Sequence, residues 1–367
     1  MRSGYIAFRL STNRWEDYKR KTHVLLRGQY DKLGEEVQPG MPAGLYVSAK
    51  PAAANRLDLA RWLTDPAHPL TSRVAVNRWW EILFGTGLVE TSEDFGIQGS
   101  PPSHPKLLDW LATELVRTGW DQRAVLKLMV LSATYRQSSN VTPALLERDP
   151  RNRLLTRGPR YRMPAEMVRD QALLVSGLLK EKLGGPSVKP YQPAGLWEDV
   201  SVERRDKYIA DVGDGLYRRS LYTFWKRTCP PPGLSTFDAP DRETCVIRRA
   251  RTNTPLQALA LMNDPTYLEA ARKLAERVLS NSTSDDARLT FAFQLVLCRN
   301  PRPEEVKVLL DIREQALAKF KNEPAAADKL LKVGSSPRDP KAAPIELAAW
   351  TIVMSTLLNL DEAISKN

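Results

Sequence analysis

Arginine, carboxylate and proline residues gather in one stretch of this chain, residues 221–264. The stretch opens with an apolar and aromatic run, residues 221–225, which predicts a short buried strand. Residues 230–233 are three prolines and a glycine, which exclude regular structure and predict a rigid turn. A long loop between a strand and a helix is a common place for a binding or catalytic site, so we expect the site here.

The charged residues of this stretch fit three kinds of chemistry. In the first, arginine–carboxylate pairs hold a long loop that lacks a hydrophobic core. In the second, the mixed charges line a groove that binds a polar polymer. In the third, two carboxylates at a set separation hydrolyse a glycosidic bond. Asp238, Asp241 and Glu243 are available for the last of these, but nothing in the sequence selects a pair. We therefore assign no catalytic residue, and the sequence favours a protein that is not an enzyme.

One aromatic residue outside the stretch joins the candidate set. Trp197 lies in an irregular segment beside acidic residues, where an indole ring can stack on a sugar. The candidate binding residues are Trp197, Asp238, Asp241, Arg242, Arg248, Arg249, Arg251 and Asn253.

A second charged group surrounds the start of the helix predicted from Pro164. Arg162, Glu166, Arg169 and Asp170 recur at helical spacing, so they share one side of that helix. Two interpretations stay open: a solvated face of self-paired charges, or an inward ion network against the arginines of the central stretch.

The cysteines and histidines predict no metal site. Cys229, Cys245 and Cys298 form no CxxC or CxxCH, which excludes a zinc ribbon, a redox motif and c-type haem attachment. Cys229 and Cys245 flank the proline turn; they form a disulfide in an oxidising compartment, or remain two free thiols. His68 and His104 each precede a proline at a helix start, which is typical of cap or turn residues.

Composition bounds the class of protein. The chain has 367 residues, 42% of them hydrophobic, and no apolar run of the length that a membrane helix needs. Its net charge of +11 fits either a solvated basic surface or a polyanionic partner such as an acidic polysaccharide. Nucleic acid is an unlikely partner, because the positive charges are mixed with acids and no nucleic-acid motif is present.

The coarse pattern predicts a mainly α fold: a helical domain punctuated by prolines, with long structured loops. Helices are expected after Asn55, Pro105, Asp121 and Pro164, among others, and short strands near residues 5–27 and 217–226. Thr254, Pro255 and Gln257 predict a capping box at the helix that closes the central stretch.

Longer motifs then suggest a family. They are residues 55–139, PAEMVRDQALLVSG, LGGPSVKPYQP, RRSLYTFWKRTCPPPGLSTFDAPDRETC, RTNTPLQALALMNDP and ELAAWTIVMSTLLNLDEAI. Together they resemble the uncharacterised planctomycete-specific C-terminal domain family. That family has no established activity and no agreed catalytic residues.

The resemblance implies a setting for the chain. Members follow a cytochrome-c-like domain and a second planctomycete-specific domain in large surface or periplasmic proteins. Those upstream domains are the expected partners, in cis or in trans, and haem is expected only on them, so this chain should hold no cofactor. The first residues carry no signal peptide, so the chain alone leaves its location open.

The same resemblance predicts the domain organisation. Residues 1–52 resemble the tail of an upstream domain, and residues 53–367 form the helical domain, divisible into lobes at 53–150 and 151–367. The expected function is a non-catalytic interaction module of an extracytoplasmic, cytochrome-associated protein. The alternative is a polysaccharide-binding or polysaccharide-acting domain that uses the central stretch.

Overall fold

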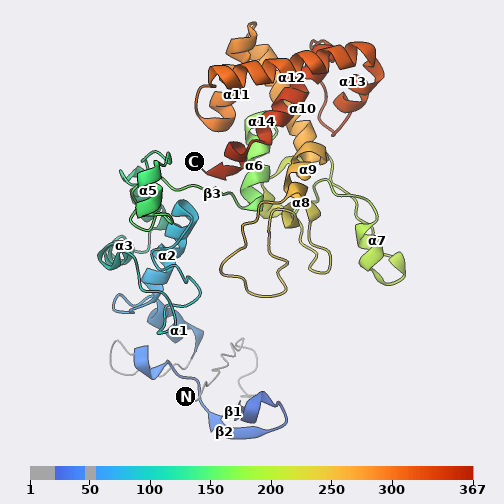
Figure 1. Ribbon diagram of the computed structural model, residues 1–367. Coiled ribbons are helices and arrows are strands. Elements are labelled where there is room, and N and C mark those ends of the chain that lie inside the picture. The colour runs from blue at the N-terminus through green and yellow to red at the C-terminus, as the bar shows by residue number, and fades with distance from the viewer. Residues whose placement is uncertain (1–20, 46–54, 367) are drawn as a thin grey trace. The chain divides into compact units, whose positions relative to one another are not determined.

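The computed structural model describes residues 21–45 and 55–366, and it confirms a mainly α fold (Figure 1). The chain divides into two compact units, Met1–Gly158 (unit 1) and Pro159–Asn367 (unit 2). The predicted boundaries at residues 52 and 150 remain predictions. The part of the predicted N-terminal strand before residue 21 lies outside the described residues.

Unit 1 is built from a small hairpin and five helices in its described part. The strands β1 and β2 pair antiparallel, with Thr22 opposite Val37. The elements are β1 (Thr22–Leu25), β2 (Leu33–Val37), α1 (Arg56–Leu63), α2 (Thr71–Phe84), α3 (Pro105–Arg117), α4 (Gln122–Leu131) and α5 (Pro143–Arg148).

Side-chain caps start α1 and α4 where the sequence predicts them. Asn55 accepts hydrogen bonds from the backbone of Leu57 and Asp58, and Asp121 caps α4 in the same way. The core forms where α2, α3 and α4 meet around Val76 and Leu115, which are fully buried.

His68 begins α2 as a turn residue, as its position before Pro69 predicts. Its Nδ1 lies 3.2 Å from the backbone nitrogen of Leu70 and 3.1 Å from that of Thr71, so the neutral ring accepts from both. The ring is buried and packs edge-on against Trp62. Burial lowers the pKa of His68, with Asp65 acting weakly in the opposite direction.

Acid should therefore weaken the start of α2. Because the pKa of His68 is lower in the folded chain than in the unfolded one, its contribution to stability is complete above about pH 6.5 and is lost as the pH falls through the folded pKa. We expect amide exchange at residues 70–74 to speed up between pH 8 and pH 5, after correction for intrinsic exchange. His68→Asn keeps a hydrogen-bond acceptor but does not titrate, so it should flatten the pH dependence of exchange. An equal pH dependence in the variant would show that His68 is not its cause.

Unit 2 holds the larger core. Its elements are β3 (Tyr161–Arg162), α6 (Ala165–Ser176), α7 (Leu196–Val200), α8 (Pro232–Ser235), α9 (Pro255–Asn263), α10 (Pro265–Asn281), α11 (Asp285–Leu297), α12 (Pro303–Asn322), α13 (Pro324–Leu331), α14 (Pro344–Leu358), α15 (Asp361–Ile364) and β4 (Ser365–Lys366). Short 3-10 turns cover Val202–Arg204, Gly213–Tyr217 and Ser220–Tyr222.

Helix α14 lies at the centre of unit 2, with α10, α12 and α13 packed against it (Figure 1). Its apolar residues cover every side, so it has no solvent face of its own, and Trp350 is fully buried. Helix α10 in turn packs against α6. Strands β3 and β4 pair antiparallel and join the start of unit 2 to its end. Across the described residues, no helix combines the length and apolar character needed to cross a bilayer.

Two local predictions are wrong. Residues 221–225 form a 3-10 turn and single bridges, such as Val188 with Thr223, and no strand, since neighbouring segments bond only at isolated points. Thr254 caps α9 without a side-chain bond, because Gln257 turns inward. Residues 324–331 form α13, which begins with a proline and continues with an alanine run, both favourable to a helix.

Gly334 lets a loop approach a buried carboxylate. It has a φ of +86°, and a Cβ there would stand 2.2 Å from Cδ of Glu269. Glu269 is buried, accepts from the hydroxyl of Tyr217 and the backbone of Ser336, and lies 3.8 Å from the buried Arg272. A side chain at residue 334 would break this cluster.

Gly334→Ala should lower the stability of unit 2 far more than Gly184→Ala. Gly184 has a similar φ of +72°, but its Cβ would meet nothing within 4 Å. The control thus reports left-handed strain alone, about 1–2 kcal/mol, and Gly334→Ala adds the clash. Urea unfolding of both variants measures the difference, and equal losses would show that the loop moves away without cost.

Candidate functional site

A hydrogen-bonded pair closes the central loop at its base. The carboxylate of Asp238 accepts from the backbone nitrogen of Thr252 at 2.7 Å and from its hydroxyl at 2.9 Å. Asp238 has a φ of 62°, a left-handed conformation that Asp tolerates better than most residues. We call residues 241–253, which begin shortly after Asp238 and end just past Thr252, the arm. Every residue of the arm is exposed.

Gln257 fixes this closure to the body of unit 2. Its amide nitrogen donates to the carbonyl of Thr236 and to the hydroxyl of Thr252, and its oxygen accepts from Arg162 at 2.9 Å. Only 1% of Gln257 is exposed. A buried amide with all these bonds made is stabilising, whereas one left unpaired is costly. Arg162 continues the chain of bonds to Asp361 at 3.2 Å.

The arginines of the arm differ in how they are held. Arg249 forms an ion pair with Glu166 at 2.7 Å, and Arg251 lies over the ring of Tyr161. Arg242 stacks on Trp225.

The rest of the arm is tied more loosely. The carbonyl of Asp241 accepts from the indole nitrogen of Trp225. Arg248 and Asn253 form no hydrogen bond or ion pair with another described residue. Both side chains are exposed to solvent.

The four residues of the predicted ion network serve separate contacts. Glu166 reaches the arm through Arg249, and Arg162 reaches Gln257. Arg169 and Asp170 instead hold the segment before the proline turn.

Arg169 is a buried clamp. Its guanidinium donates to the carbonyls of Leu216 and Arg218, while Asp170 accepts from the backbone of Ser220 at 2.7 Å. Burial lowers the pKa of Arg169, against the charge of Asp170. These bonds position a loop and leave little of the guanidinium for a ligand.

Trp197, in α7, is 8% exposed. The amines of Lys189 and Lys226 lie 5.2 and 4.7 Å from its ring centre, and Tyr208 meets it edge-on. A sugar would have to displace these groups to stack on the indole, so the structure brings no carbohydrate platform together here.

The cysteines are free thiols in the structure. Cys229 is half-buried and lies 3.8 Å from the carbonyl of Leu196, whereas Cys245 and Cys298 are exposed. Within the described ranges, no group of three His, Cys, Asp or Glu side chains is placed to hold a metal ion.

A small polar cavity lies behind the proline turn. Its volume is about 30 Å³, and its wall includes Arg169, Gln192, Thr223 and Asp264. Burial raises the pKa of Asp264, while its hydrogen bond with Thr266 acts in the opposite direction. Gln192 Nε2 and Thr223 Oγ1 have no partner among the described residues. The space suits about one or two waters that would satisfy these atoms.

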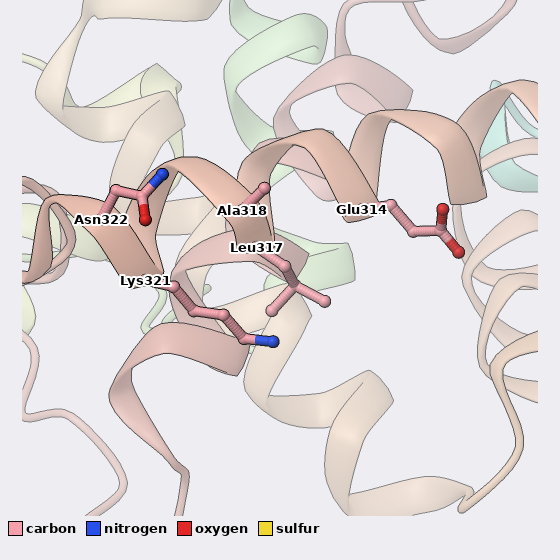
Figure 2. A pocket seen from close by; sticks show the side chains of 5 residues that line it. All are labelled: Glu314, Leu317, Ala318, Lys321 and Asn322. Carbon is pink, nitrogen blue, oxygen red and sulfur yellow. The ribbon is translucent and has the colours of Figure 1, made fainter.

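A larger hollow, of about 440 Å³, runs along α12. Figure 2 shows its lining residues, which all belong to that one helix: Glu314, Leu317, Ala318, Lys321 and Asn322. The Glu314 carboxylate lies at one end and Asn322 at the other, so polar groups do not converge on a point (Figure 2). An open groove on one helix lacks the opposing wall of a ligand site.

The arm and its anchors lie inside the segment that a known family shares. The model of PSD1, a protein of unknown function (DUF1553), matches residues 55–312. The chain belongs to this family. No curated protein and no solved structure matches it. Membership of PSD1 therefore assigns no activity to the chain. The matched residues include the arm, Gln257 and Arg169.

The residues predicted from the sequence omit three of the groups that organise the base of the arm. Thr252, Gln257 and Asp361 were absent from the candidate set, although Asp238 and Arg162, their partners, were in it. The available signal was a glutamine in the first turn of an otherwise apolar helix, where an amide needs a buried partner.

Removing the Asp238 carboxylate should release the arm. Asp238→Ala deletes both bonds to Thr252, so we expect faster amide exchange at residues 241–254 and a small loss of stability, about 1–3 kcal/mol. Glu243→Ala is the matched control, because this exposed carboxylate has no side-chain partner among the described residues. If the two variants exchange alike, the Asp238–Thr252 pair does not hold the arm.

Proposed function

We propose that this protein is a non-catalytic interaction module, with a docking face formed by the arm and the outer side of α9. The observation that carries the proposal is the exposed apolar face of α9. Leu256, Leu259 and Met262 are 61%, 54% and 51% exposed. Gln257 and Leu261, on the opposite side of the helix, are buried. Exposed apolar surface of this kind marks a surface that another molecule covers.

The arm leads directly into α9 along the chain and adds charge to the proposed face. Val246 and Ile247 are 44% and 46% exposed, and Arg248 follows them without an ion-pair partner among the described residues. Arginine beside apolar residues is the composition enriched at protein interfaces. An acidic partner surface with an apolar centre would complement both features, and the net charge of +11 would speed its approach.

The partners we propose are the domains that precede this family in longer proteins: the cytochrome-c-like domain and the second planctomycete-specific domain. They would dock in cis or in trans, and haem would stay on the former. Such an assembly would lie in the periplasm or at the cell surface, as the resemblance implies. Nothing around Trp197 in the described part of the chain favours the polysaccharide alternative, since Lys189 and Lys226 lie over its ring.

Leu259→Glu should weaken binding of these two domains, supplied in trans from a full-length relative, by at least about tenfold, or ~1.4 kcal/mol. The reason is that a charge is placed at the centre of an apolar contact. Val308→Glu is the matched control, because Val308 is 57% exposed on α12, away from the proposed face. Isothermal titration calorimetry measures both, with thermal melting to show that each variant is folded. Equal binding by the two variants would remove α9 from the interface, and no binding by the unaltered chain would overturn the proposed function.

A further inference from the structure

The centre of the arm has no backbone support. In residues 244–250, no backbone nitrogen or carbonyl forms a hydrogen bond with another described residue, and every side chain is exposed. Proteases bind their substrates as extended strands, so a segment must give up its own backbone bonds before it enters the cleft. This segment has none to give up, and exposed loops of this kind are where chains are nicked.

The side chains select one bond within this segment. Arg248 has no partner among the described residues, whereas Arg249 is paired with Glu166. A protease with an acidic specificity pocket takes a free arginine side chain on the acyl side of the bond that it cuts. Arg248 is available for that pocket without breaking an ion pair.

We infer that the arm is a processing site, where an arginine-specific protease hydrolyses the bond between Arg248 and Arg249 and leaves unit 2 folded. One water adds across the peptide bond. Arg248 gains a C-terminal carboxylate and Arg249 a free amine.

The folded core explains why the cut chain would stay together. The core of unit 2 combines residues before the arm, such as Leu173 and Phe237, with residues after it, such as Leu274 and Trp350. Helix α6, before the arm, packs against α10, after it. Breaking one exposed bond between them removes none of this packing.

Each new end would also keep its own anchor. Upstream of the cut, Asp241 remains bonded to Trp225. Downstream, Arg249 remains paired with Glu166, and Thr252 with Asp238. The loss falls on Val246 and Ile247, which would lie in the free end left upstream of the cut.

This last point rests on the proposed function and adds regulation to it. If the docking face needs the apolar residues of the arm beside α9, then cutting the arm lowers partner affinity without unfolding the domain.

A second arginine pair in unit 2 makes the inference specific. Arg204 and Arg205 also lie in an exposed loop, but they sit in a 3-10 turn whose backbone is bonded to Ser201 and Val202. Their guanidinium groups pair with Asp199 and Glu203. They should therefore be cut more slowly than Arg248.

The experiment is limited digestion of the full chain with trypsin, followed by mass spectrometry of the products. Within unit 2, the first cut should follow Arg248, and the two fragments should co-elute on size exclusion with a melting temperature close to that of the intact chain. Arg248→Gln should slow cutting in the arm by about tenfold, equivalent to 1.4 kcal/mol in the barrier. Arg204→Gln, the matched control, should leave it unchanged.

A first cut of unit 2 elsewhere, or fragments that separate, would overturn the inference. Partner binding by the nicked chain then tests the regulatory step. Weaker binding than that of the intact chain supports it, and equal binding overturns it while leaving the docking proposal in place. Failure of the intact chain to bind would instead count against the docking proposal alone.

Discussion

The buried amide of Gln257 is the interaction on which the candidate site depends. It joins the start of unit 2, the loop after the proline turn and helix α9 through hydrogen bonds of a single side chain. Inside the protein such bonds are stronger than in water, and losing one leaves a buried polar group unpaired. The arm beyond it can therefore lack structure of its own while its two ends stay fixed.

Arginine has two different roles in this protein: some arginines are buried and hold loops, and others are exposed. Arg169 and Arg218 are buried and hold loops by donating to backbone carbonyls, which gives irregular segments the bonds that a sheet would otherwise supply. In the arm, Arg242, Arg249 and Arg251 are exposed and contact a ring face or a single carboxylate. The planar guanidinium suits both tasks, so counting arginines in the sequence could not separate scaffold from surface.

Much of the fold followed from local chemistry. Caps such as Asn55 and Asp121, and prolines at first helical positions, located helix starts because these signals act within one turn of the chain. The inward turn of Gln257 could not be predicted in this way, since its partners lie 95 and 21 residues away in sequence. The same holds for Trp197, whose lysine neighbours come from separate loops. The candidate residues remain a prediction, because what each of them does depends on long-range packing that local sequence signals do not report.

The outward apolar side of α9 has a consequence for the free domain in solution. Its three large side chains attract other copies, while the net charge of +11 repels them. Salt shortens the range of that repulsion and leaves the apolar attraction intact. The colloidal stability of the isolated domain should therefore be greatest in dilute buffer, and physiological ionic strength should bring it closer to self-association.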